Sequence, residues 1–293
     1  MRNVTDIIRP SSVEEAVALL QRDTPRTAAL AGGTTLVGEG SPEVGALVDL
    51  AALSLDYIRP NSQGLHLGAM TTLQELVDSE AVRAVAGGQL SRAAHASTSN
   101  LLRRQATLGG SLVSGRAPEL ATLLCALDAR VALHAPQPSE APLAALFAAS
   151  WDARHGLLTE VVIPARSTLG VGIHAVRRTP TDAPIVAVAA ALALDGDRVQ
   201  FVGLAAGGAV IDPPQGAPPR LPTPWPLRFA VVESALAGKT LSNRLIDTAA
   251  SLAAGDTPAI DDYLASAAYR RAMVSVLLKR ALGDAWRAAL EVR

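Results

Sequence analysis

The chain has 293 residues, of which 49% are hydrophobic and 18% charged, and its 26 Lys and Arg against 27 Asp and Glu give a formal net charge of −1. This composition supplies a buried core, which excludes a disordered chain, and the balanced charge excludes a global field that would hold nucleic acid or an anionic membrane. The single cysteine, Cys125, excludes an internal disulfide framework. It also excludes an iron–sulfur cluster held by this chain alone, because such a cluster needs about four Cys ligands.

The hydropathy pattern predicts no membrane span. The richest apolar stretch runs from Ala183 to Leu194, which is shorter than the roughly 18–20 residues that a span needs. The first six residues lack the apolar segment of a signal peptide. We therefore expect a soluble, cytoplasmic protein.

The start of the chain predicts one helix and two buried strands. Ser12 and Glu15 form one of two overlapping capping boxes, and apolar residues at helical spacing follow over 13–20. Short apolar runs at 27–30 and 46–50 predict strands on either side of a Gly-Gly turn. This order favours an α/β arrangement.

The middle of the chain continues to alternate helices and strands. In chain order we expect a strand at 65–67, a helix capped by Thr72 and Glu75, a helix over 81–102 that its glycines and polar run can break, a helix at 120–127, and strands at 130–134 and 157–163. The last of these strands ends at Pro164.

After about residue 166 the pattern becomes antiparallel. A strand is expected at 172–177, and the apolar runs 185–194 and 199–204 flank Asp195-Gly196-Asp197, which is a hairpin signal. A proline-rich loop at 212–226 leads to helices near 228–237, 242–254 and 263–282. In the last helix, we expect one apolar face made of Tyr269, Ala272, Met273 and Val276.

Two glycine turns, at 32–38 and 109–115, share one pattern. Each has Gly-Gly, then Ser or Thr, and then a Gly five residues after the second glycine. Glycine allows positive φ and lets a ligand approach bare N–H groups, and successive N–H groups can form a concave nest for an anion. Two nests suit a ligand with two linked phosphates, or one phosphate from each of two ligands. The alternative is a pair of plain tight turns between buried elements.

The remaining motifs assign no catalytic or metal-binding residue. Glu39 and Arg116 stand where a P-loop needs Lys, and neither turn fits G-x-G-x-x-G. His66 and His134 lie in apolar strands, where packed or hydrogen-bonded core histidines are expected. No cluster has metal-ligand spacing, and no G-x-S-x-G elbow is present.

The order of these motifs resembles the flavin-binding subunits of the molybdenum hydroxylases, the family of xanthine and carbon monoxide dehydrogenases. Residues 31–36, Ala-Gly-Gly-Thr-Thr-Leu, resemble the Ala-Gly-Gly-Thr-Asp-Leu loop of that family. Residues 103–111 resemble its second loop, Arg-Asn-x-Ala-Thr-Ile-Gly-Gly-Asn. Further similar segments follow in family order at 67–72, 178–190 and 269–282.

The resemblance implies an α+β fold. A two-subdomain FAD-binding module of the vanillyl-alcohol-oxidase/PCMH type would occupy 1–166, with subdomains at about 1–55 and 56–166. A smaller antiparallel-sheet plus helix domain would follow at 167–293.

The resemblance also implies a binding mode for FAD. The cofactor would lie extended between the two subdomains, with its pyrophosphate on the two glycine loops and its ring toward the C-terminal domain. Glu119 stands near the flavin-contacting Asp of the family, and His174 stands where some members carry Lys. The implied cofactor-binding residues are Leu30, Ala31, Gly32, Gly33, Thr34, Thr35, Leu36, Thr107, Gly109, Gly110, Ser111, Ser114, Glu119 and His174.

The implied function is electron transfer in an FAD-dependent oxidoreductase. Electrons would arrive from an iron–sulfur small subunit, fed by a molybdopterin large subunit, and would leave to NAD⁺, oxygen or another acceptor. Two alternatives stay open. One is a stand-alone flavin reductase or oxidase on the same scaffold, and the other is a flavin-free assembly partner.

Overall fold

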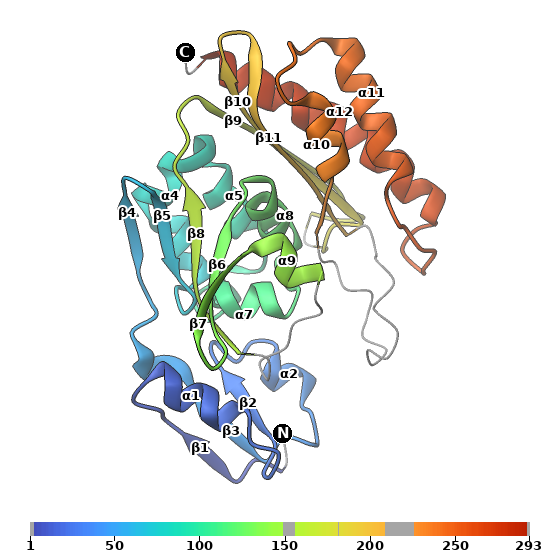
Figure 1. The fold of residues 1–293 in the computed structure, drawn as a ribbon. Helices are drawn as coiled ribbons and strands as arrows, with labels where there is room; N and C mark the ends of the chain where they lie inside the picture. Colours follow the sequence, from blue (N-terminus) through green and yellow to red (C-terminus); the bar gives the residue numbers. More distant parts are fainter. Residues whose placement is uncertain (1–2, 149–155, 181, 209–225, 292–293) are drawn as a thin grey trace.

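The structure is a computed structural model that describes residues 3–148, 156–180, 182–208 and 226–291. Figure 1 shows three regions that follow the chain from one end of the molecule to the other, each built on its own sheet. The proline-rich loop expected at 212–226 lies outside the described residues, apart from Pro226.

The first region is a small parallel sheet covered by one helix. Its elements are β1 (Asp6–Ile8), α1 (Val13–Leu20), β2 (Thr27–Leu30), α2 (Leu36–Glu39), β3 (Ala46–Asp49) and the short helix η1 (Leu50–Leu53), and the strand order is β1-β3-β2. The predicted start of α1 is confirmed, because the Ser12 hydroxyl accepts from the Glu15 N–H at 3.2 Å. The apolar side of α1 packs against the sheet through Ala16, Val17 and Leu20.

The second region is an antiparallel sheet with helices. Its strands are β4 (Ile58–Asn61), β5 (Gly64–Gly68), β6 (Arg130–His134), β7 (Pro138–Pro142) and β8 (Leu157–Pro164), in the order β4-β5-β8-β6-β7. Its helices are α3 (Leu73–Asp78), α4 (Glu80–Ala84), η2 (Val85–Gly88), α5 (Gln89–Ala96), α6 (Asn100–Arg103), α7 (Leu108–Val113), α8 (Pro118–Ala126) and α9 (Leu143–Ala148). The helix expected over 81–102 is therefore broken. Ala86 and Gly87 adopt positive φ, and Ser99 caps a new helix.

The third region is a second antiparallel sheet backed by three helices. It consists of β9 (Leu169–Val176), β10 (Val186–Asp195), β11 (Arg198–Gly207), β12 (Leu227–Arg228), α10 (Ala230–Leu236), α11 (Asn243–Gly255) and α12 (Ala267–Glu291), with strand order β12-β11-β10-β9. The hairpin expected at Asp195-Gly196-Asp197 is confirmed by the pairing of β10 with β11, and Gly196 has φ +57°.

Strand β10 is buried on both faces, which makes this sheet a shared layer. Ala189 and Ala191 belong to the core of the second region, whereas Val188 and Ala190 belong to the core formed with α10, α11 and α12. Successive side chains of a strand point to opposite faces. The sheet therefore lies between two apolar cores, one formed with the helices of the second region and one with the C-terminal helices.

The face of α12 that packs on the sheet differs from the expected one. Tyr269 and Val276 are 41% and 37% exposed, whereas Val274, Leu278 and Ala281 are fully buried. The sheet selects the buried face, because glycines of β9 let the helix approach closely. A Cβ built on Gly172 would lie 2.2 Å from the carbonyl oxygen of Ala281. Sequence periodicity could not separate the two faces, since this helix carries small or apolar residues on both.

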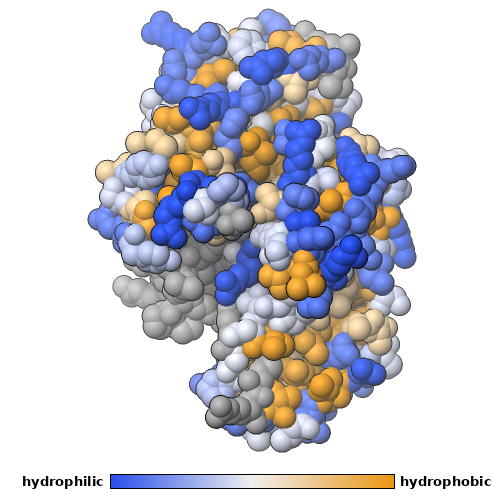
Figure 2. All heavy atoms as spheres, turned by 180° about the vertical axis from the view of Figure 1, so that it is seen from behind, coloured by the Kyte–Doolittle hydropathy of each residue, from blue (hydrophilic) through white to orange (hydrophobic). Residues whose placement is uncertain are grey.

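The surface is mixed in polarity, and no helix of the described residues is long and apolar enough to cross a membrane. Seen from behind, apolar side chains gather at the lower end of the molecule, where the first region lies (Figure 2). Ile7 and Val37 of that region are 59% and 62% exposed.

Candidate functional site at the two glycine loops

The first glycine loop connects β2 to α2 and presents a row of backbone donors. Gly33 has φ +69°, as the sequence predicts, and its carbonyl accepts from the Val37 N–H at 3.0 Å. Among the hydrogen bonds of the described residues, none uses a backbone N–H of residues 32–36. A run of N–H donors without protein acceptors is the arrangement that binds an anionic group.

Gly32 brings this loop against the second region. A Cβ at Gly32 would lie 1.7 Å from the carbonyl oxygen of Gln105, so only glycine allows this approach. Gln105 precedes the second glycine loop, and its contact with the first loop was not predicted. The sequence carries no signal for it, because the contact uses a backbone carbonyl that every residue type possesses.

The second glycine loop has a different structure from the first. Thr107 caps α7, and its hydroxyl accepts from the Gly110 N–H at 3.2 Å. The N–H groups of Leu108 and Gly109 donate to the carbonyls of Thr71 and Ala69, both at 2.8 Å, and that of Ser111 donates to the Thr107 carbonyl at 2.9 Å. The fold therefore uses these donors. Positive φ is found at Gly115, with φ +68°, but not at Gly109 or Gly110, so the expected left-handed Gly-Gly turn is wrong here.

The two loops nevertheless meet. The Thr35 hydroxyl lies 3.4 Å from the Ser114 hydroxyl, and the latter donates to the Gly110 carbonyl at 2.7 Å. A Cβ at Gly110 would lie 3.8 Å from the Ala31 Cβ. Residues of 31–36 and 107–114 thus form one cluster, with backbone donors from the first loop and hydroxyl groups from the second.

Glu119 begins α8 just beyond this cluster and contacts the third region. Its side chain is 11% exposed and forms an ion pair with Arg177, which follows β9. Burial raises the pKa of the Glu119 carboxyl, and the charge of Arg177 opposes that rise. Arg177 belongs to an Arg-Arg pair in the sequence, but its partner became visible only in the fold.

His174 lies apart from the loops. Its Nε2 is 2.8 Å from Oδ2 of Asp284 on α12. In β9, Gly172 faces α12, whereas Val171 and Ile173 pack into the core of the second region. By strand alternation, His174 shares the α12 side. The structure does not bring it to the glycine loops, and its cofactor-binding role stays a prediction.

The cluster fits the phosphate part of a dinucleotide. The first loop supplies the row of N–H groups, and its Thr35 hydroxyl lies 3.4 Å from the Ser114 hydroxyl of the second loop. Within the described ranges, no group of three or more His, Cys, Asp or Glu side chains could hold a metal ion. The arrangement suits an organic phosphate cofactor.

Models of two known domain families match the chain. Residues 2–166 match a family model described as the FAD binding domain in molybdopterin dehydrogenase, and residues 221–285 match the CO dehydrogenase flavoprotein C-terminal domain.

Similar proteins span almost the whole chain. The glyceraldehyde dehydrogenase medium chain of Sulfolobus acidocaldarius is 26% identical over 288 residues, covering 94% of this chain and 96% of the relative. The carbon monoxide dehydrogenase medium chain of Hydrogenophaga pseudoflava is 26% identical over 289 residues, covering 94% and 95%.

Solved structures share the fold. The carbon monoxide dehydrogenase structure from Hydrogenophaga pseudoflava that lacks the Mo-pyranopterin moiety has a TM-score of 0.83 at 26% identity, covering 97% of this chain and 98% of that one. Quinoline 2-oxidoreductase from Pseudomonas putida 86 has a TM-score of 0.80 at 22% identity, covering 98% of each chain, and supports the fold alone.

Proposed function

This chain belongs to the family of FAD-binding domains in molybdopterin dehydrogenases, and we propose that it carries electrons from a redox partner through FAD to an outside acceptor. It is an FAD-binding subunit of an oxidoreductase of the molybdenum hydroxylase type. The observation that carries the proposal is the donor row of residues 32–36 joined to the hydroxyls of the second loop.

The residues of the cluster have distinct roles in this proposal. The N–H groups of residues 32–36 would hold the pyrophosphate of FAD, because none of them donates to a protein acceptor among the described residues. The Thr35 hydroxyl joins the two loops by its contact with Ser114, which in turn donates to the Gly110 carbonyl of its own loop. FAD, when bound, supplies a carrier that accepts and releases electrons.

The environment of the flavin ring is assigned to the boundary with the third region. Glu119 and Arg177 form a largely buried ion pair there, a few residues along the chain from Ser114. We assign Glu119 as the ring-side residue, following the resemblance. Neither member of the pair is needed as a proton donor in electron transfer, so no catalytic residue is assigned.

The partners follow from what this chain lacks. It has one cysteine, and its described residues offer no metal cluster. In this proposal, electrons enter from another chain. We propose an iron–sulfur small subunit and a molybdopterin large subunit as partners, and NAD⁺, oxygen or another carrier as the acceptor. Relatives named as medium chains support this division of labour.

A visible spectrum of the purified chain, with and without added FAD, tests the cofactor assignment. We expect a flavin spectrum and release of flavin into the supernatant after heating. Colourless protein after incubation with excess FAD would favour the flavin-free assembly partner.

Co-expression with neighbouring genes tests the electron path. We expect copurification of a Cys-rich small subunit and a molybdenum-containing large subunit. Substrate should reduce the flavin only in the assembled complex. Turnover of an organic substrate by the isolated chain, at rates of order 1–10³ s⁻¹, would instead establish a stand-alone flavoenzyme.

A further inference from the structure

Helix α8 is connected to the third region by ion pairs near both of its ends. Every residue from Pro118 to Ala126 is buried, and the helix contacts β10 and β11 of the third region. At its start, Glu119 pairs with Arg177 of that region. Just past its end, Asp128 pairs with Arg228 of β12. The helix is therefore attached to the C-terminal domain at two places.

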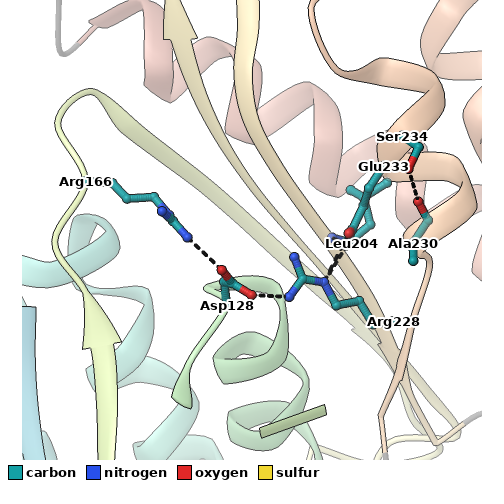
Figure 3. A network of polar contacts seen from close by, with 7 residues as sticks. All are labelled: Asp128, Arg166, Leu204, Arg228, Ala230, Glu233 and Ser234. Atoms are coloured by element: carbon teal, nitrogen blue, oxygen red, sulfur yellow. Dashed lines mark hydrogen bonds and ion pairs between the residues drawn. The ribbon is translucent and has the colours of Figure 1, made fainter. Parts of the chain in front are cut away.

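The Asp128 end is a network of alternating charges (Figure 3). The Asp128 carboxylate accepts from Arg166, at 2.9 Å, and from Arg228. Arg228 also donates from Nε to both oxygens of Glu233, at 2.9 and 3.1 Å. Glu233 accepts in turn from the Leu204 N–H of β11 at 2.7 Å. The network thus runs without a break from the second region into the sheet and helix of the third.

Arg166 strengthens the connection by a second contact. Its guanidinium lies 3.7 Å from the centroid of the Phe201 ring on β11. Cation–π contacts of this kind favour Arg over Lys because the planar guanidinium stacks on the ring. Asp128 therefore pairs with Arg166 from its own side of the domain boundary and with Arg228 from the other side. Arg166 also contacts Phe201 on that other side.

The backbone conformation at Asp128 is suited to its pairing with the two arginines. It has φ +59°, and its N–H donates to the Cys125 carbonyl at 3.1 Å as α8 ends. Positive φ is uncommon for residues other than glycine, with Asp and Asn among the more tolerant.

We propose that Asp128 is a positioning residue that sets the orientation of the C-terminal domain on α8, and through α8 the surroundings of the flavin ring. The inference rests on the proposed function, in which the ring lies near Glu119. The two ends of α8 are about 13 Å apart for nine residues. Asp128 is thus remote from Glu119 along the helix and acts through it. Losing Asp128 shifts the ring environment while the pyrophosphate loops keep their structure.

The test compares full-length wild-type protein with Asp128→Asn, which removes the charge and keeps a side chain suited to positive φ. Arg228→Lys is the second variant, because a single ammonium cannot bridge Asp128 and Glu233 as the guanidinium does. Asp247→Asn is the matched control. Asp247 forms a 2.7 Å ion pair with Lys279 within the C-terminal helices and bridges no domain boundary.

Two kinds of measurement are made on each protein, one on the domain contact and one on the flavin ring. Hydrogen exchange of residues 227–236, in protein without added FAD, reports the attachment itself. Flavin fluorescence, visible circular dichroism and the midpoint potential of FAD-loaded protein report the ring. We expect exchange in both variants to rise about tenfold, as for loss of a charged hydrogen bond. We also expect the flavin fluorescence, visible circular dichroism and midpoint potential of both variants to shift, while their FAD stoichiometry and affinity stay at the wild-type values. The control should match wild type in every measurement.

The outcomes that contradict this proposal can be told apart from those that contradict the proposed function. Unchanged exchange and unchanged ring signals overturn the proposal. Loss of FAD or of the fold in both variants also overturns it, because the network would then be a general folding element. If the wild-type chain binds no FAD, the proposed function fails and the flavin half of this inference fails with it. The exchange measurement still decides whether Asp128 holds the domain.

Discussion

The two glycine loops share a sequence pattern and differ in what they do with their backbone. In the first loop, Gly33 has φ +69°, and the N–H groups of residues 32–36 have no protein acceptor among the described contacts. In the second, Gly109 and Gly110 lie inside α7, and their N–H groups donate to Ala69 and to Thr107. The first loop leaves these donors without a protein acceptor, and the second uses them in hydrogen bonds within the fold.

The comparison shows that a repeated motif does not imply a repeated role. Gly109 is required for packing, because a Cβ there would lie 2.9 Å from the Ala69 Cβ and 3.0 Å from its carbonyl oxygen. Gly33 meets only ordinary contacts at 3.4 and 3.5 Å, so its positive φ is the reason for glycine. Substitutions in the two loops should therefore have different consequences.

The largest effect is expected for Gly33→Val, which should abolish FAD binding and leave the chain folded. Left-handed backbone costs an L-residue about 1–2 kcal/mol, more for a β-branched one, so the loop relaxes and the donor row turns away. FAD titration followed by absorbance, with far-UV circular dichroism as the fold control, measures this. Normal FAD binding by the variant would show that the first loop is a plain turn.

A smaller effect is expected for Thr34→Ala. The hydroxyl follows the Gly-Gly pair and supplies one hydrogen bond, worth roughly 0.5–1.5 kcal/mol net, or up to about 3 kcal/mol to a charged group. FAD affinity should fall by about twofold to 100-fold while thermal stability stays at the wild-type value. An unchanged dissociation constant would remove this side chain from the site.

Gly110→Ala should change FAD binding less than either of these variants and should change stability only slightly. The added Cβ would lie 2.8 Å from Oγ1 of Thr107, which disturbs a helix cap worth about 0.5–2 kcal/mol. Alanine recovers about 1 kcal/mol of helix propensity over glycine. We therefore expect a net loss of about 1 kcal/mol or less in chemical denaturation. Abolished FAD binding by this folded variant would mean that both loops present their backbone to the ligand.

The smallest effect is expected for Glu119→Gln, beyond the second loop, and concerns the pH dependence of stability. Burial raises the pKa of its carboxyl, so the folded state favours the protonated form. That contribution to stability is complete below the pKa of the unfolded chain and is lost as pH rises through the raised folded value. Unfolding of wild type and Glu119→Gln, followed from acid to neutral pH, should show the variant gaining relative stability as pH rises. The opposite trend would show that Arg177 governs the site.

Much of the fold follows from local sequence. Capping at Ser12 and at Thr72 with Glu75 fixed two helix starts, and the hairpin at Gly196 followed from its turn residues and flanking apolar runs. These features depend on neighbours in the chain, where hydrogen bonding and backbone preference act over a few residues. The first glycine loop belongs to this group, because positive φ at Gly33 is a local property.

The remaining features of the fold depend on contacts between residues that are distant in sequence. The use of the donors in the second loop depends on the carbonyls of Ala69 and Thr71, and the buried face of α12 depends on the approach allowed by Gly172. The pairing of Asp128 with Arg228 spans 100 positions. The sequence by itself determined the family resemblance, the local elements and the donor-bearing first loop. Only the tertiary structure decided which of the two loops leaves its backbone N–H groups without a protein acceptor, because a backbone N–H is available to a ligand only if no carbonyl elsewhere in the chain accepts its hydrogen bond.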